Sequence, residues 1–182
     1  MSSDQALIHP SSEGPLDLDP PVRVGVMASG NGSNFEALAT AIRDGHINAE
    51  IALLVVNNPG CGAQQRAERL GIPWQLFNHR NYDSRSALDR DLVQRFQSLG
   101  VDGIVMAGWM RIVTNELIQA FPDRLINIHP SLLPSFRGLD GVGQAIKAAV
   151  RLAGCTVHLA TEHDAGAQHD HLPCTYDRVN GV

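Results

Sequence analysis

Short apolar runs and helix-spaced apolar stripes alternate along the chain from residue 22 onward. Residues 22–28 form a run rich in β-branched side chains that leads into glycines, which predicts a buried strand entering a turn. The next segment carries apolar side chains at positions i, i+3, i+4 and i+7, the stripe of an amphipathic helix, at Phe35, Leu38, Ala39 and Ile42. The pattern thus changes from strand to helix within a few residues.

The same alternation continues to residue 160. Further strands are predicted at residues 51–56, 74–77, 103–107, 125–128 and 155–160. Further helices are predicted from Ala63 to Leu70 and over residues 84–99, the latter with Leu88, Leu92, Phe96 and Leu99 facing inward. Because parallel strands need crossover connections, this order predicts an α/β fold: a Rossmann-like, mostly parallel sheet with helices on both faces.

Length and charge narrow the class of protein. The chain has 182 residues, which predicts one domain at about 100–200 residues per domain. A net charge of -5 argues against nucleic acid as a partner, and the apolar runs are far shorter than the ~20 residues that span a bilayer, so no membrane contact is expected. Three cysteines without a CxxC pair, Cys61, Cys155 and Cys174, indicate reduced thiols and a cytoplasmic location.

The two ends of the chain differ from its middle. Residues 1–21 hold four prolines among Ser, Asp and Glu and lack the pattern of a signal peptide, so we expect a disordered N-terminal tail. The folded domain is predicted to cover residues 22–166. Residues 167–182 lose the apolar patterning and are expected to form an atypical C-terminal tail.

A glycine turn, Gly30 to Asn34, lies where the first strand passes into the first helix. Backbone N–H groups and the helix dipole favour an anion there, so a phosphate would fit. The alternative is a tight turn in which Ser33 or Asn34 caps the helix. A dinucleotide site is disfavoured, because Phe35 replaces the third glycine and the second strand ends in asparagines rather than an acidic residue. A P-loop is excluded because no GK[ST] follows.

Asn127 and His129 stand two residues apart at the end of the predicted strand before Pro130. Strand alternation places both on one face, ~6.6 Å apart, at the carboxyl edge where ligands bind in open α/β sheets. A carboxamide donor and an imidazole at one point can stabilise an oxyanion and move a proton, which suggests acyl transfer or hydrolysis. The alternative is a structural histidine beside a proline loop.

The run NIHPSLLPSFRG at residues 127–138 resembles the signature of the folate-dependent formyltransferases. With GNGSN, DSR, AGWMRI and GCTVH in the same order, residues 22–166 are similar to the members that formylate glycinamide ribonucleotide in purine synthesis. The resemblance implies 10-formyltetrahydrofolate as donor, direct attack by the amine, and no metal. It implies a monomer or homodimer acting on small molecules.

The resemblance also implies roles for individual residues. Asn127 would bind the formyl oxygen, His129 would stabilise the tetrahedral intermediate as an acid, and Asp164 would orient His129. The substrate phosphate would be held by the residues matching the family's phosphate site, Gly32, Ser33, Asn34 and Arg85. The folate would lie against the segment Met110, Arg111, Ile112 and Val113.

Two departures from the family pattern affect these expectations. Six positions separate His158 from Asp164 where the family has seven, so Asp164 is expected to be displaced. After Gly166 the family continues with an apolar strand and a long helix, which this sequence lacks, so we expect a truncated form and weak binding of glycinamide ribonucleotide. The alternatives are a formyltetrahydrofolate hydrolase and a non-catalytic folate- or phosphate-binding remnant. The histidines of the tail, His163, His169 and His171, form no closed metal-binding set.

Overall fold

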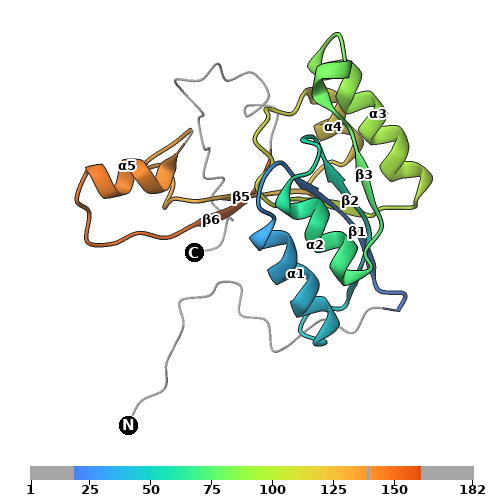
Figure 1. Cartoon of the computed structure of the whole chain (residues 1–182), viewed down its shortest axis with the longest axis horizontal. Helices are drawn as coiled ribbons and strands as arrows, with labels where there is room; N and C mark the ends of the chain where they lie inside the picture. Colours follow the sequence, from blue (N-terminus) through green and yellow to red (C-terminus); the bar gives the residue numbers. More distant parts are fainter. Residues whose placement is uncertain (1–18, 139, 161–182) are drawn as a thin grey trace, which may run out of the picture.

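A computed structural model describes residues 19–138 and 140–160 of the chain. It contains a six-stranded sheet in the order β3-β2-β1-β4-β5-β6 (Figure 1). The strands are β1 (Val22–Ala28), β2 (Ala49–Val56), β3 (Trp74–Leu76), β4 (Gly103–Met106), β5 (Leu125–His129) and β6 (Thr156–Leu159). The helices are α1 (Ser33–Arg43), α2 (Gly62–Leu70), the 3₁₀ turn η1 (His79–Asn81), α3 (Arg85–Ser98), α4 (Asn115–Ala120) and α5 (Gly141–Lys147).

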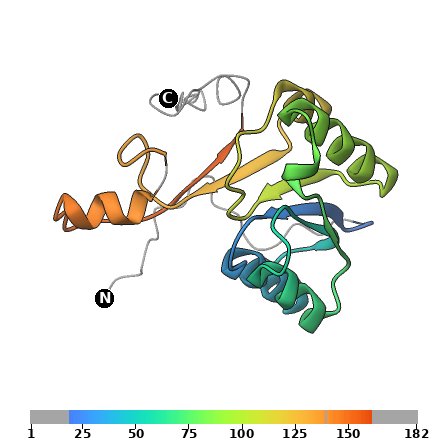
Figure 2. The same cartoon turned by 45° about the horizontal axis from the view of Figure 1, so that its top comes forward.

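Helices cover both faces of the sheet, because its inner strands are apolar on both sides. Figure 2 shows α1 and α2 below the sheet and α3 and α4 above it. In β1, Val26 and Ala28 pack with α1 and α2, while Met27 between them packs with α3 and α4. The core residues of α1 and α2 are the small or aromatic Phe35, Ala39, Ala63 and Ala67, and those of α3 and α4 include Leu88, Leu92, Phe96 and Leu117.

The predicted mostly parallel α/β sheet is confirmed. β1 to β5 pair in parallel, and β6 pairs antiparallel with β5, so that Asn127 faces His158 and His129 faces Thr156. The predicted inward side chains of α3 are buried, except that Leu99 is half-buried. The expected tails fall largely in residues 1–18 and 161–182, which lie outside the described part of the chain.

Two α-helices, α4 and α5, and the 3₁₀ turn η1 were not predicted from the sequence. α4 has six residues, which is too short to show a helical period. α5 is capped by Asp140, whose side chain accepts a hydrogen bond from the Gly143 N–H. The helix stands apart from the other helices, beyond the end of β5 and the start of β6 (Figure 1). Its Val142 and Ile146 are 55% and 74% exposed, so its apolar side chains do not mark it as a core helix.

Candidate functional site

Three loops meet at the carboxyl edge of the parallel strands. β4 lies between β1 and β5, so the segment after β4 leaves the sheet between the glycine turn after β1 and the proline loop after β5. The predicted site residues within the described ranges all lie at or after the carboxyl ends of strands. Arg85 is included because the chain reaches it from the end of β3 by way of η1. The carboxyl edge of an open α/β sheet is where ligands bind.

The glycine turn has the geometry of an anion site. Gly32 is the N-cap of α1 at φ 77°, and within the described part of the chain no side chain is recorded as capping the helix. The expected alternative, capping by Ser33 or Asn34, is therefore wrong: both lie in the first helical turn and are exposed. Because the first N–H groups of a helix have no partner within it, an uncapped start favours a bound anion.

The turn is closely packed against α2. A Cβ on Gly32 would lie 2.5 Å from the Ala63 Cα, so a larger side chain does not fit. Arg66 of α2 donates from Nε to the Asn31 carbonyl at 2.8 Å and also forms an ion pair with Glu36. Arg69 pairs with the same carboxylate. The negative charge of Glu36 in the first turn of α1 is thus compensated, which removes a repulsion that would oppose a phosphate.

Ser29 connects the turn to the segment after β4. Its N–H donates to the Gly108 carbonyl at 3.0 Å, and its Oγ accepts from the Met110 N–H at 2.9 Å. Its carbonyl accepts from Nδ2 of Asn58 at 2.8 Å, so the asparagine that replaces an acidic residue at the end of β2 supports the turn. Sequence analysis did not find this role, because nothing in the local pattern distinguishes Ser29 from an ordinary turn residue.

The side chains of the predicted folate segment, residues 110–113, differ in their exposure to solvent. Met110 is 70% exposed, Arg111 and Ile112 are half-buried, and Val113 is buried in the core on the α3 side of the sheet together with Trp109. The side chains of Met110 and Ile112 are therefore the apolar ones available to a ligand.

Arg85 is the first residue of α3 and is exposed. The side chain of Ser84 caps this helix by accepting from the Ala87 N–H at 3.1 Å. Among the described residues no carboxylate lies within ion-pair distance of Arg85, so its guanidinium is available to an anion.

Asn127 faces His158 across the β5–β6 pair, and its Nδ2 lies 3.1 Å from Nε2 of His158. His158 Nδ1 lies 3.1 Å from the Leu159 carbonyl, which can only accept, so Nδ1 carries the hydrogen. In the neutral ring Nε2 then accepts from Asn127. One of the two amide hydrogens is used in this way, and the second is available to a substrate oxygen. His158 belongs to the GCTVH motif, but the motif alone predicts no role for it.

His129 is held by the loop that follows it. Its Nε2 donates to the Phe136 carbonyl at 3.3 Å, and the described residues supply no partner for Nδ1. The loop is fixed to β6, because Thr156 Oγ1 donates to the Ser131 carbonyl at 2.7 Å and accepts from the Leu133 N–H at 2.9 Å. Asn127 and His129 thus share one face of β5, each oriented by a contact outside its own strand.

Other expectations concern residues that lie beyond the described ranges. Asp164 and the histidines of the tail fall within residues 161–182. The expected displacement of Asp164 relative to His158 therefore also lies outside the described residues. Within residues 19–138 and 140–160, no three metal-binding side chains form a cluster. In the same ranges, none of the helices has the length and apolarity needed to cross a membrane.

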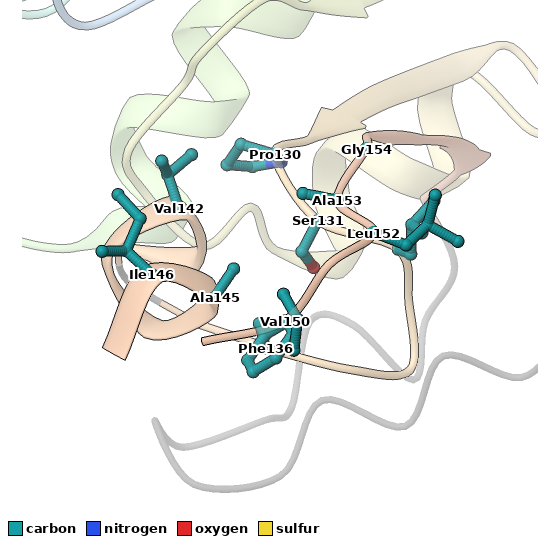
Figure 3. Close-up of a pocket in the computed structure, with 11 residues that line it drawn as sticks. Pro130, Ser131, Phe136, Val142, Ala145, Ile146, Val150, Leu152, Ala153 and Gly154 are labelled. Atoms are coloured by element: carbon teal, nitrogen blue, oxygen red, sulfur yellow. The ribbon is translucent and has the colours of Figure 1, made fainter. Parts of the chain in front are cut away.

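A cavity of about 150 Å³ lies beside the proline loop, and sequence analysis did not predict it. Figure 3 shows apolar side chains of α5 and of the chain after it around this space. Its lining consists of Pro130, Ser131, Leu132, Phe136, Val142, Ala145, Ile146, Val150, Leu152, Ala153 and Gly154. Ser131 Oγ already donates to the Ser135 carbonyl at 2.6 Å, so the cavity wall is essentially apolar, and none of the predicted site residues lines it.

The fold and site define a class of α/β proteins whose parallel sheet carries an uncapped glycine turn and an asparagine–histidine pair at the same carboxyl edge. The sequence model of the formyl transferase family matches residues 22–169, and the chain belongs to this family.

Individual relatives agree with this assignment. The chain is 43% identical over 137 residues to phosphoribosylglycinamide formyltransferase of Bacillus subtilis, covering 75% of this chain and 70% of that protein. It is 38% identical over 161 residues to the trifunctional purine biosynthetic protein adenosine-3 of Gallus gallus, of which it spans 16%. The crystal structure of glycinamide ribonucleotide transformylase 1 from Symbiobacterium toebii matches with a TM-score of 0.76 at 39% identity, over 80% of this chain and 68% of that one.

Proposed function

We propose that this chain transfers a formyl group from 10-formyltetrahydrofolate to the amine of glycinamide ribonucleotide, a step of purine biosynthesis. The observation that carries the proposal is the placement of Asn127 and His129 on one face at the carboxyl end of β5, on the same edge as an uncapped glycine turn. The family membership and the names of the relatives support this substrate pair.

The substrates occupy two parts of the edge. The phosphate of glycinamide ribonucleotide binds the N–H groups of Gly32, Ser33 and Asn34, and Arg85 supplies a positive charge. The folate lies against residues 110–113, where Met110 and Ile112 give apolar contact. Because β4 lies between β1 and β5, a folate bound there reaches toward His129 from beside the turn.

The reaction joins the amine nitrogen to the formyl carbon, and the carbonyl electron pair moves onto oxygen. The free amide hydrogen of Asn127 and the His129 ring stabilise that oxygen, which carries the developing charge. The carbon–nitrogen bond to the folate then breaks, the folate nitrogen gains a proton, and the former amine loses one. His129 acts through Nδ1, the ring nitrogen that is not held by Phe136. Protonated there, it donates to the oxyanion, gives that proton to the folate nitrogen as the carbon–nitrogen bond breaks, and takes up the proton that the amine loses. Asp164 orients the imidazole.

The test is to incubate the protein with 10-formyltetrahydrofolate, with and without glycinamide ribonucleotide, and to follow release of tetrahydrofolate. Release that depends on the ribonucleotide is the expected result. Release without it would replace the transferase with a hydrolase, and no release with either mixture would contradict both activities.

A further inference from the structure

Asp89 is a carboxylate with no part in the proposed reaction. It lies in α3 and is 2% exposed, between the core side chains Leu88 and Leu92. Among the residues that the structure describes, it is the only charged side chain that is buried. Burying a carboxylate is costly unless hydrogen bonds and charges compensate it, so its contacts indicate what it does.

The main contact of Asp89 is with the end of the predicted folate segment. Its Oδ2 accepts from the Thr114 N–H at 2.6 Å. Burial raises the pKa of Asp89, whereas the hydrogen bonds from Thr114 and the positive charge of Arg111 lower it, and the Glu116 carboxylate raises it. Arg111, which belongs to the segment, is therefore close enough to interact with this carboxylate.

The segment is held at both ends by side chains from other elements. Ser29 accepts the Met110 N–H at one end, and Asp89 accepts the Thr114 N–H at the other. Between these anchors Val113 is buried, while Met110 is 70% exposed. The ligand-facing side chains therefore lie on a short stretch whose path is set by two hydrogen-bond acceptors.

We propose that Asp89 is a positioning residue for the formyl donor, which holds the Thr114 end of residues 110–114 in the shape that binds the folate without touching the folate itself. This inference rests on the proposed function. It implies that loss of the acceptor weakens folate binding, because the segment must then be ordered when the folate binds.

Three variants test the proposal. Asp89→Ala removes the acceptor, and Asp89→Asn keeps an oxygen in the same place while removing the charge. Asp102→Ala is the matched control, because Asp102 also accepts a backbone N–H, that of Arg23 at 2.8 Å, but just before β4, at the opposite edge of the sheet. If Asp89→Ala does not fold, Asp89→Ser takes its place, since its shorter side chain withdraws the acceptor from Thr114.

The readouts are the calorimetric Kd for 10-formyltetrahydrofolate and the separate kcat and KM of transfer. For Asp89→Ala we expect Kd and KM for the folate to rise about tenfold with kcat changed less than about threefold. Asp89→Asn restores the folate KM to within about threefold, and Asp102→Ala leaves it unchanged.

Two results would overturn the inference. If the wild type binds the folate and Asp89→Ala binds it equally well, the positioning role is wrong while the proposed function stands. If the wild-type protein binds no folate, both fail together.

Discussion

The Asn127 amide and the His158 ring face each other across the β5–β6 pair, 3.1 Å apart from Nδ2 to Nε2. The Leu159 carbonyl holds the other ring nitrogen, so the imidazole fixes the rotation of the amide about its side chain. An amide that is fixed before the substrate binds is pre-organised for an oxyanion, because no reorientation is needed as charge develops.

His158→Ala should slow transfer without removing the Asn127 donor itself. Loss of one hydrogen bond is worth about 1–1.5 kcal/mol, so we expect kcat to fall about tenfold with the folate KM little changed. Val157→Ala is the control, because Val157 is the preceding residue of β6 and is 63% exposed. Equal kcat values for the two variants in steady-state assays would show that the contact has no catalytic effect.

Gly32→Ala should disrupt the glycine turn. The left-handed conformation costs about 1–2 kcal/mol with a Cβ, and the overlap with Ala63 adds about 1–3 kcal/mol. We therefore expect a lower free energy of unfolding and a higher KM for glycinamide ribonucleotide. Gly30→Ala is the matched control in the same turn, because its Cβ would meet no atom within 4 Å. Urea titration of both variants measures the difference, and equal stabilities would contradict the packing argument.

Tyr82 should remain protonated well into the alkaline range. Burial and the hydrogen bond that its hydroxyl donates to Asp91 at 2.9 Å raise the pKa of Tyr82 from 10.0 to about 12. Absorbance titration of a Tyr176→Phe variant observes this phenol alone, since the sequence has two tyrosines. Asp91→Asn should bring the pKa part of the way back toward 10.0, and a midpoint near 10.0 in both proteins would contradict the assignment.

The same pKa has a consequence for stability with a definite sign. Above pH 10.0 the phenol ionises in the unfolded chain before it does so in the folded one, so the folded state holds more protons. Tyr82 thus lowers the free energy of unfolding as the pH rises from 10.0 to about 12. Tyr82→Phe should remove that part of the pH dependence in denaturant titrations.

The sequence could predict the parts of the fold that repeat a pattern. The stripe of Phe35 and Ala39 identified α1, and the apolar runs identified the strands, because a helix or strand buried on a sheet must show its period. α5 was not predicted, although Val142, Ala145, Ile146 and Ala149 have the i, i+3, i+4, i+7 spacing of a helical stripe, because the stripe is short and glycines at 138, 141 and 143 precede or interrupt it. The polar alternation of β6 likewise gave no indication that it runs antiparallel to β5.

The candidate site was predictable where residues are close in sequence and not where distant residues meet. Asn127 and His129 could be placed on one face from strand alternation alone. The contact of Asn127 with His158 depends on the register of two strands, 31 positions apart, and that of Asp89 with Thr114 on the packing of α3. Neither follows from local spacing. The role of Asp164 stays a prediction.

The proposed transfer depends most directly on His129, and single-turnover transfer by His129→Ala tests this dependence. With both substrates saturating and the folate Kd measured in parallel, we expect the rate to fall by about 10²–10⁴-fold while the folate binds as before. A His129→Ala protein that binds the folate and transfers the formyl group within about tenfold of the wild-type rate would contradict the central claim.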